Sequence, residues 1–400
     1  MRQSAWQTPN TLLILMSVAM PVAFSAWSAL LNNFVVERAA FTGVEIGILQ
    51  SLREIPGFLA FTTVFVLLII KEQVFAVLAL ALLGVGVAIT GFFPSTTGLY
   101  LTTILMSAGF HYFEVLKQSL SLQWYGKSEA PRALGRLIAI GSVTSLTVYA
   151  LLWLLLEIFA MDYVWLFLLA GSVCGGLAIF MWLGFPRFEA KHEQTRQLVL
   201  RKRYWLYYAL QFFSGARRQI FTVFAAFLMV EKFGYSASEV ALLFLFNYAF
   251  NWAFAEKIGG LIGRIGERSA LSVEYLGLII VFTAYAFVES PTLGAALYVI
   301  DHMFFALAIA VNTYFQKIAS AGDIASSAGV SFTINHIAAV IVPAALGLVW
   351  VVSPTAVFLI GAGFAVCSLI LSQNIPRRPV EGNEVTWGRV RVRSESPALR

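Results

Sequence analysis

Long apolar segments alternate with short polar breaks along the whole 400-residue chain. An α-helix needs about 20 mostly apolar residues to cross the hydrocarbon core of a bilayer, and each segment reaches about that length. The pattern therefore predicts an all-α polytopic membrane protein with twelve transmembrane helices. Their approximate bounds are 11–35, 43–70, 74–93, 97–124, 134–158, 163–184, 204–230, 238–262, 270–288, 292–316, 324–350 and 354–373.

One polar break is longer than the others and divides the twelve predicted helices into two sets of six. It covers residues 187–203 and is rich in lysine and arginine. We expect two six-helix bundles joined by this linker, and a polar, basic tail that is mobile. The predicted domains are 1–186, 187–203, 204–376 and 377–400.

The composition agrees with a membrane protein. Hydrophobic residues make up 59% of the chain and charged residues 12%, whereas soluble domains are about 25% charged. Cys174 and Cys367 both fall inside apolar segments, so the sequence contains no disulfide framework.

Basic residues are distributed unequally between the two ends of the predicted helices. Twelve spans place both chain ends and the linker on one side, and 21 of the 27 lysines and arginines fall there, against two on the opposite side. Cytoplasmic loops carry such an excess, so we expect cytoplasmic termini and a location in the cytoplasmic (inner) membrane. The same distribution accounts for the net charge of +6 without a nucleic-acid partner.

The two halves of the chain repeat each other at a constant offset of 194 residues. Val36–Arg38 corresponds to Val230–Lys232 at the ends of the first and seventh predicted helices. Thr42–Glu45 corresponds to Ser236–Glu239, and each of these pairs has the pattern of a capping box that opens a helix. Parallel six-helix repeats of this kind are a known transporter architecture.

The polar turn after segment 238–262 contains a glycine and arginine motif. It resembles the loop signature of the major facilitator superfamily, Gly-x-Leu-x-Asp-Arg-x-Gly-Arg-Arg. Gly263 stands where the family usually has Asp, Glu267 stands where it usually has Arg, and the equivalent loop at residues 65–74 lacks the signature. The matching positions are Gly259, Leu261, Arg264, Gly266 and Arg268.

The resemblance implies a secondary transporter whose two halves rock about a central cavity. In this family the cavity is lined mainly by the first, fourth, seventh and tenth helices, and the matched loop shapes a gate. We expect a monomer in the lipid bilayer that takes a small-molecule substrate, couples its movement to protons by symport or antiport and uses no cofactor.

Two adjacent arginines near the middle of segment 204–230 are the strongest indication of a site. Arg217 is about 13 residues from either end of the segment, or about 20 Å along a helix, so its side chain cannot reach the membrane surface. A charge at the bilayer centre costs about 2.5–3.5 kcal/mol, and no acid lies within a helical turn. We therefore expect Arg217 and Arg218 to face a water-filled cavity and Arg217→Ala to fold normally. A structural ion pair between Arg218 and Asp301 is the alternative.

Other ionisable residues lie at similar depth, with four bases against three acids. His111, Glu114 and Lys117 form one stripe along a helix, either as a neutral structural ladder or as a functional cluster. Arg53 and Glu54 are adjacent, so their side chains diverge by about 100° and are not expected to pair. The surplus of bases predicts a net-positive cavity.

We assign roles to these residues by their chemistry. Arginine presents a planar fork that matches two oxygens of an anion, and Asn247 and Asn251 share one helix face because they are four residues apart. Carboxylates and imidazoles in poorly hydrated surroundings are candidates to carry protons. The predicted substrate-binding residues are Arg217, Arg218, Arg53, Lys117, Asn247 and Asn251, and the predicted proton-coupling residues are Asp301, His302, Glu114, Glu54, His111 and His336.

These features together predict a proton-coupled transporter of a small organic anion or acidic-headed solute. One alternative is a proton-driven exporter of amphipathic or cationic compounds, which would bind them through Glu54, Glu114 and Asp301. Another is a non-transporting scaffold or sensor on the same fold. No metal motif, nucleotide-binding loop or nucleophile–base arrangement is visible in the sequence, so we assign no catalytic residue and do not expect an enzyme.

Overall fold

The computed structural model describes residues 6–125, 130–188, 200–320 and 324–388, without the side chains of a few helical residues. The described part is all α-helical apart from short 3₁₀ and π turns, which confirms the predicted fold class. The helices are α1 (Pro9–Ala39), α2 (Gly43–Phe58), α3 (Thr63–Val66), α4 (Glu72–Thr90), α5 (Thr96–Trp124), α6 (Ala130–Glu157), α7 (Tyr163–Gly184), α8 (Trp205–Gln219), α9 (Ala226–Glu231), α10 (Ala237–Ile265), α11 (Glu267–Phe287), α12 (Pro291–Phe305), α13 (Ile309–Ile318), α14 (Ile324–Val352) and α15 (Pro354–Ser372).

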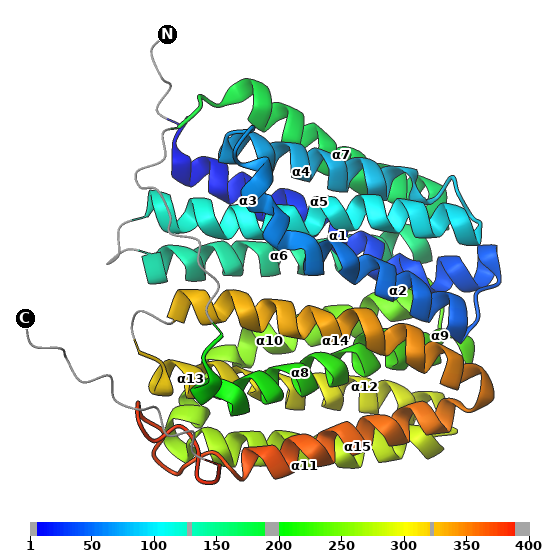
Figure 1. The fold of residues 1–400 in the computed structure, drawn as a ribbon. Coiled ribbons are helices and arrows are strands. Elements are labelled where there is room, and N and C mark those ends of the chain that lie inside the picture. Colours follow the sequence, from blue (N-terminus) through cyan, green and yellow to red (C-terminus); the bar gives the residue numbers. More distant parts are fainter. Residues whose placement is uncertain (1–5, 126–129, 189–199, 321–323, 389–400) are drawn as a thin grey trace, which may run out of the picture.

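The helices form two bundles that lie side by side with their axes in a common direction (Figure 1). One bundle contains α1–α7 and the other contains α8–α15. The start of α1 meets the end of α7, where the Gln7 side chain donates a hydrogen bond to the Gly184 carbonyl at 2.6 Å. The end of α15 lies on the same side of the molecule (Figure 1). We call this the terminal side and the opposite one the far side.

The internal repeat is visible in where the helices begin. α6 and α14 begin at residues 130 and 324, and α2 and α10 begin at 43 and 237. Both predicted capping boxes are confirmed, with Thr42 and Glu45 opening α2 and Ser236 and Glu239 opening α10. Each box satisfies backbone N–H groups that the first turn of a helix leaves without a partner.

Three of the predicted helices are interrupted. α2 ends just after Pro56 and Gly57, and a 3₁₀ turn then leads into the short α3, as expected where proline removes a backbone donor. α8 passes into a π-helical turn at 220–225 before α9, and such turns occur often at functional sites. A 3₁₀ turn at 306–308 separates α12 from α13.

Within the described residues, eight helical stretches are long and apolar enough to cross a membrane on their own. The other membrane segments contain α2, α5, α8 and α10, which are either broken or too polar to meet that condition. Three of them, α2, α5 and α8, carry all the charged residues of the cavity described below. Protein surrounds their polar groups in place of lipid, which is the usual environment of ionisable residues in membrane proteins.

The two bundles are in close contact on the far side, where α2 meets α14. A Cβ atom on Gly47 would lie 2.4 Å from the carbonyl oxygen of Pro343 and 3.1 Å from the Cα of Gly347. The backbone N–H of Ala344 donates a hydrogen bond to the Ser51 hydroxyl at 3.0 Å. Small residues therefore bring the two helix backbones together and close the far side of the interface.

The segment after α15 folds back against the second bundle. The Tyr314 hydroxyl donates to the Glu384 carbonyl at 2.5 Å, Arg203 lies 3.4 Å from Glu381, and Val385 is only 3% exposed. The expectation of a mobile tail is therefore wrong for residues 377–388, because an ion pair and a buried side chain hold them. Residues 389–400 lie outside the described part of the chain.

Candidate functional site

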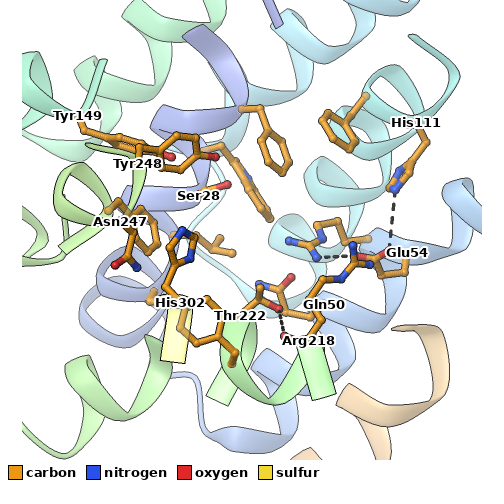
Figure 2. Close-up of a pocket in the computed structure, with 18 of the residues that line it drawn as sticks. Ser28, Gln50, Glu54, His111, Tyr149, Arg218, Thr222, Asn247, Tyr248 and His302 are labelled. Carbon is orange, nitrogen blue, oxygen red and sulfur yellow. Dashed lines mark hydrogen bonds and ion pairs between the residues drawn. The ribbon is translucent and has the colours of Figure 1, made fainter. Parts of the chain in front are cut away.

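A cavity of about 400 Å³ lies between the two bundles (Figure 2). Its walls come from α1, α2, α5 and α6 on one side and from α8, the π turn, α10, α12 and α14 on the other. The volume is within the range of about 300–1,000 Å³ that is usual for small-molecule sites. The lining side chains are aromatic (Phe24, Trp27, Phe110, Tyr149, Phe221, Phe244, Tyr248, Tyr298), uncharged (Ser28, Leu31, Asn32, Gln50, Thr222, Asn247), imidazole (His111, His302, His336) and charged (Arg53, Glu54, Glu114, Arg218).

The formal charges of the cavity wall cancel. Arg53 and Arg218 face Glu54 and Glu114 in the lining, so the expectation of a net-positive cavity is wrong. Two of the four predicted bases are turned elsewhere, as described below. Glu54 and Arg218 lie toward one end of the cavity, and the two tyrosines Tyr149 and Tyr248 toward the other (Figure 2).

Arg218 is the charged residue that the second bundle contributes to the wall. Its guanidinium donates a hydrogen bond to the Asn335 side-chain oxygen at 2.8 Å, and its charge acts on Glu54 from the other bundle. The alternative of a permanent ion pair between Arg218 and Asp301 is not found, because Asp301 faces the interior of the second bundle.

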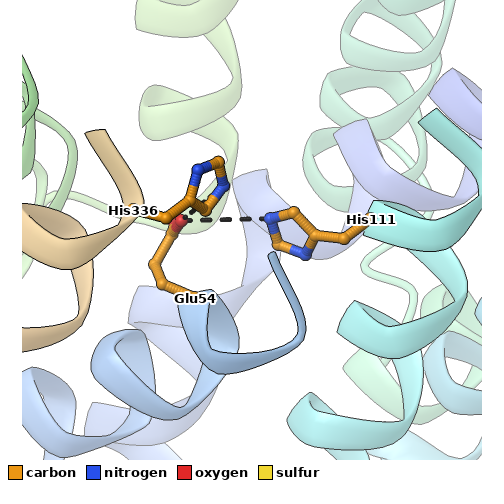
Figure 3. A group of neighbouring side chains, drawn as sticks. All are labelled: Glu54, His111 and His336. Atoms are coloured by element: carbon orange, nitrogen blue, oxygen red, sulfur yellow. Dashed lines mark ion pairs between the residues drawn. The ribbon is translucent and has the colours of Figure 1, made fainter. Parts of the chain in front are cut away.

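Glu54, His111 and His336 converge from three helices (Figure 3). Glu54 Oε2 lies 3.9 Å from His111 Nε2 and 3.6 Å from His336 Nε2, and all three residues are at most 5% exposed. Glu54 Oε1 accepts a hydrogen bond from Arg53 Nη2 at 2.5 Å. The expectation that Arg53 and Glu54 do not pair is therefore wrong, because the arginine side chain is long enough to reach its neighbour's carboxylate.

Arg217 does not face the cavity, in contrast to the prediction. Its side chain is fully buried inside the second bundle, where Nη1 lies 3.2 Å from Glu274 Oε1. The guanidinium carbon also lies 4.4 Å from the centre of the Tyr275 ring. Successive residues on a helix point about 100° apart. Arg218 therefore reaches the cavity, while Arg217 finds an acid and an aromatic face on α11.

Asp301 lies next to this ion pair and not in the cavity wall. It is fully buried, and neither carboxylate oxygen has a hydrogen-bond partner within the described part of the chain. The charges of Arg217 and Glu274 are close enough to act on it. Its neighbour His302 does line the cavity. Arg217 thus contacts one buried carboxylate, Glu274, and a second, Asp301, lies nearby without a direct contact.

The remaining predicted site residues have mixed positions. Asn247 and Glu114 line the cavity, whereas Lys117 is half-buried farther along α5 toward the terminal side. The side chain of Asn251 lies outside the described residues.

The predicted gate motif lies between α10 and α11. Gly266 ends α10 with φ at +80°, a left-handed conformation that favours glycine. Arg264 is exposed on the terminal side, and Gly259 lies outside the described residues.

Two contacts connect the second part of this motif to neighbouring helices. Arg268 donates to the Gln373 side-chain oxygen at 3.0 and 3.2 Å, and Glu267 forms an ion pair with Lys317 at 2.6 Å. Glu267 stands where the family usually has arginine. The described contacts of the motif therefore join α11 to α13 and to the residue that follows α15, all in the second bundle.

Sequence reasoning missed Glu274, a fourth acid at membrane depth, and most of the aromatic residues that line the cavity. Glu274 is an ionisable residue inside an apolar segment, which is the signal that could have identified it. The aromatic residues gave no local signal, because the chain contains 34 Phe, 14 Tyr and 10 Trp, most of them outside the cavity.

Two helical bundles that enclose a polar cavity at their interface define a secondary membrane transporter with many membrane-spanning helices. Residues 10–343 match the sequence profile of the family described as Major Facilitator Superfamily. The chain belongs to this superfamily, as the loop signature and the repeat had implied. A search of curated proteins finds no match to the sequence.

Solved structures of other transporters have the same fold. A mutant of the nucleoside transporter NupG superposes with a TM-score of 0.77 at 15% identity, over 92% of this chain and 99% of that one. A POT family transporter in complex with 5-aminolevulinic acid gives 0.70 at 12% identity, over 91% and 94% of the two chains. A bacterial homologue of the human lysosomal transporter Spinster, inward-facing and occupied, gives 0.66 at 14% identity, over 91% and 95%. At these identities the similarity shows the fold alone.

Proposed function

We propose that the protein is a proton-coupled secondary transporter of a small organic solute that carries an acidic group. The observation that supports this most is the cavity between the bundles, which Arg218 lines together with aromatic rings and amides. A cavity of about 400 Å³ would hold about 13 water molecules at about 30 Å³ each. It therefore suits a solute of metabolite size.

Arg218 is the proposed anchor for the acidic group. Arg53 is already paired with Glu54 at 2.5 Å, whereas the hydrogen-bond acceptor of Arg218 is the neutral amide of Asn335. A guanidinium can bind a carboxylate or phosphate through two parallel hydrogen bonds. The aromatic rings would then pack against the rest of the solute.

Arg217, Glu274 and Asp301 are the proposed proton-carrying group. All three are fully buried, and an unpaired charge in such surroundings is costly. A single proton on one of the two carboxylates leaves the group neutral, and its loss leaves one negative charge. Asp301 adjoins the cavity residue His302, so rocking of the bundles could expose the group to water from one side at a time. Among the described residues, the other titratable side chains next to this proton-carrying group are the tyrosines Tyr275, Tyr285 and Tyr298.

The orientation in the membrane is part of the proposal. The terminal side carries the excess of lysine and arginine, so it would face the cytoplasm of a cell whose cytoplasmic membrane holds the protein.

A substrate-charge profile tests the anchor. The purified protein would be mixed with a monocarboxylate, a phosphate monoester, a nucleoside or a quaternary ammonium compound, and stabilisation against heat would be measured. We expect an acidic compound to bind, and Arg218→Lys and Arg218→Gln both to weaken it at least tenfold, because lysine keeps the charge without the fork. Arg136→Gln, which removes an exposed arginine of α6 outside the cavity lining, is the matched control. Unchanged binding to Arg218→Gln would contradict the proposal, and stabilisation by the cation alone would favour an exporter of cationic compounds.

A neutral, ring-bearing solute is a second candidate. The balanced charges and the aromatic wall of the cavity suit it, and the nucleoside transporter NupG has the same fold. In the same experiment, a nucleoside would then bind wild type and Arg218→Gln about equally.

A further inference from the structure

The three donor atoms at the Glu54, His111 and His336 cluster lie within 4.8 Å of one another. The cluster joins the two bundles, because Glu54 on α2 and His111 on α5 belong to the first and His336 on α14 belongs to the second. Two imidazoles and one carboxylate are a donor set that occurs at zinc sites. We propose that this cluster binds a divalent transition-metal ion such as Zn²⁺ and that the bound ion holds the two bundles together at the level of the cavity.

The distances are close to those a zinc ion requires. Bonds of about 2.0–2.1 Å in a tetrahedral site place neighbouring donor atoms about 3.3–3.5 Å apart. Glu54 Oε2 lies 3.6 Å from His336 Nε2 and 3.9 Å from His111 Nε2. Small side-chain rotations would therefore complete this part of the site without a change in the helices (Figure 3).

Neighbouring groups orient the donors as ligands. His111 Nδ1 lies 3.1 Å from the Ser107 carbonyl oxygen and 3.0 Å from the Ser107 hydroxyl. An N–H at Nδ1 that donates to this carbonyl leaves the lone pair on Nε2, which faces Glu54. Such a hydrogen bond from the second ring nitrogen is the usual support of a metal-bound histidine. On the other side, Arg53 holds Glu54 Oε1 and leaves Oε2 toward the imidazoles.

Gly57 provides the space in which the two imidazoles meet. A Cβ atom at this position would lie 2.3 Å from His336 Cδ2 and 2.6 Å from His111 Cδ2. Any larger residue would push the rings apart. Because the three donors also line the cavity, a fourth coordination position would be open to water or to a solute.

The positive charges nearby oppose cation binding. Arg53 and Arg218 both act on Glu54, so without a metal the same residues form a hydrogen-bonded ion-pair network. The two possibilities differ in one measurable property, because only a metal site takes up one equivalent of Zn²⁺ through all three residues.

Binding is tested on the purified full-length protein after treatment with a chelator. Zn²⁺ is titrated calorimetrically, and Co²⁺ is titrated as a coloured probe whose visible absorption distinguishes four-coordinate from six-coordinate sites. We expect one equivalent of each ion to bind and Co²⁺ to give the intense four-coordinate bands. Glu54→Gln, His111→Ala and His336→Ala should each weaken binding at least tenfold. His302→Ala removes another imidazole from the same cavity and should bind as wild type does.

Failure of wild type to bind Zn²⁺, or equal binding by wild type and all three cluster variants, would overturn the proposal. Thermal unfolding without metal shows whether each variant is folded. The Co²⁺ spectrum of wild type tests the metal site even if a variant fails to fold.

A separate experiment tests whether the bound ion holds the two bundles together, and this part of the inference rests on the proposed alternating access. Spin labels at Gln118 on α5 and Leu261 on α10, in a chain with Cys174 and Cys367 replaced by serine, report the distance between the bundles on the terminal side. Zn²⁺ should narrow the distance distribution of wild type and leave that of His336→Ala unchanged. No change in wild type that binds Zn²⁺ would contradict the bridging role while leaving the metal site intact. Neither experiment measures transport or uses the solute, so both can be carried out and interpreted even if the substrate proposal fails.

Discussion

Replacing Arg217 by alanine should destabilise the protein, although the change removes a charge from the interior of a membrane protein. The sequence alone suggested the opposite, because an isolated charge at the bilayer centre costs about 3 kcal/mol. In the structure Arg217 is fully buried and lies 3.2 Å from Glu274. Loss of one partner from a buried ion pair typically costs about 3–5 kcal/mol, because the other charge is left unpaired.

The two partners should not be equivalent. After Arg217→Ala, two buried carboxylates, Glu274 and Asp301, remain without a base. After Glu274→Gln, Asp301 is still close enough to Arg217 to balance its charge. The free energy of unfolding should then fall by only about 1–3 kcal/mol, the usual cost of an unsatisfied buried polar group. The double variant Arg217→Met with Glu274→Leu replaces the pair by apolar side chains but leaves Asp301 without a base, so it should regain only part of the stability that Arg217→Ala loses.

Unfolding in mixed micelles with increasing denaturing detergent measures these differences, with wild type, both single variants and the double variant under one set of conditions. The reasoning is refuted if Arg217→Ala unfolds at the same detergent fraction as wild type. It is also refuted if Glu274→Gln is the less stable of the two single variants, since Asp301 would then not share the arginine.

Three other predictions follow from particular contacts. Asp301→Asn should abolish uphill transport but keep counterflow exchange, because binding survives without proton release; equal loss of both would indicate a structural role. Gly57→Ala should lower the free energy of unfolding by about 1–3 kcal/mol through overpacking, whereas Gly141→Ala, whose nearest contact would be 3.6 Å away, should be neutral in the same denaturation assay. Val385→Asp should release the folded tail, seen as faster proteolysis after residue 376, and equal cleavage rates would contradict the buried position of Val385.

The apolar pattern predicted the helices well because the length and composition of a span are local properties. α7, for example, occupies residues 163–184, the segment expected. The internal repeat was also predicted correctly, because each capping box depends on two residues that are only three positions apart. The break in α2 after Pro56 was not predicted, although the proline was visible. The segment around it is apolar enough that hydropathy alone conceals the interruption.

The site was predicted only in part because its geometry depends on helix rotation and on contacts between distant segments. Arg217 and Arg218 differ by one position, and no pattern in the sequence showed which of them would meet Glu274. Glu54, His111 and His336 were each identified as midplane residues, but they come from three helices, so their convergence has no sequence motif. The tail was judged by its polar composition, which does not reveal the buried position of Val385.

Proton movement driven by a solute is the decisive measurement for proton-coupled transport. Purified protein would be reconstituted in liposomes that contain a pH-sensitive dye, and the acid, nucleoside and quaternary ammonium compounds of the binding panel would be added outside in turn. We predict that an acidic compound moves protons with it in wild-type liposomes and that Asp301→Asn liposomes show no proton signal for the same compound. Solute uptake without any proton signal, or an equal signal in wild type and Asp301→Asn, would contradict it.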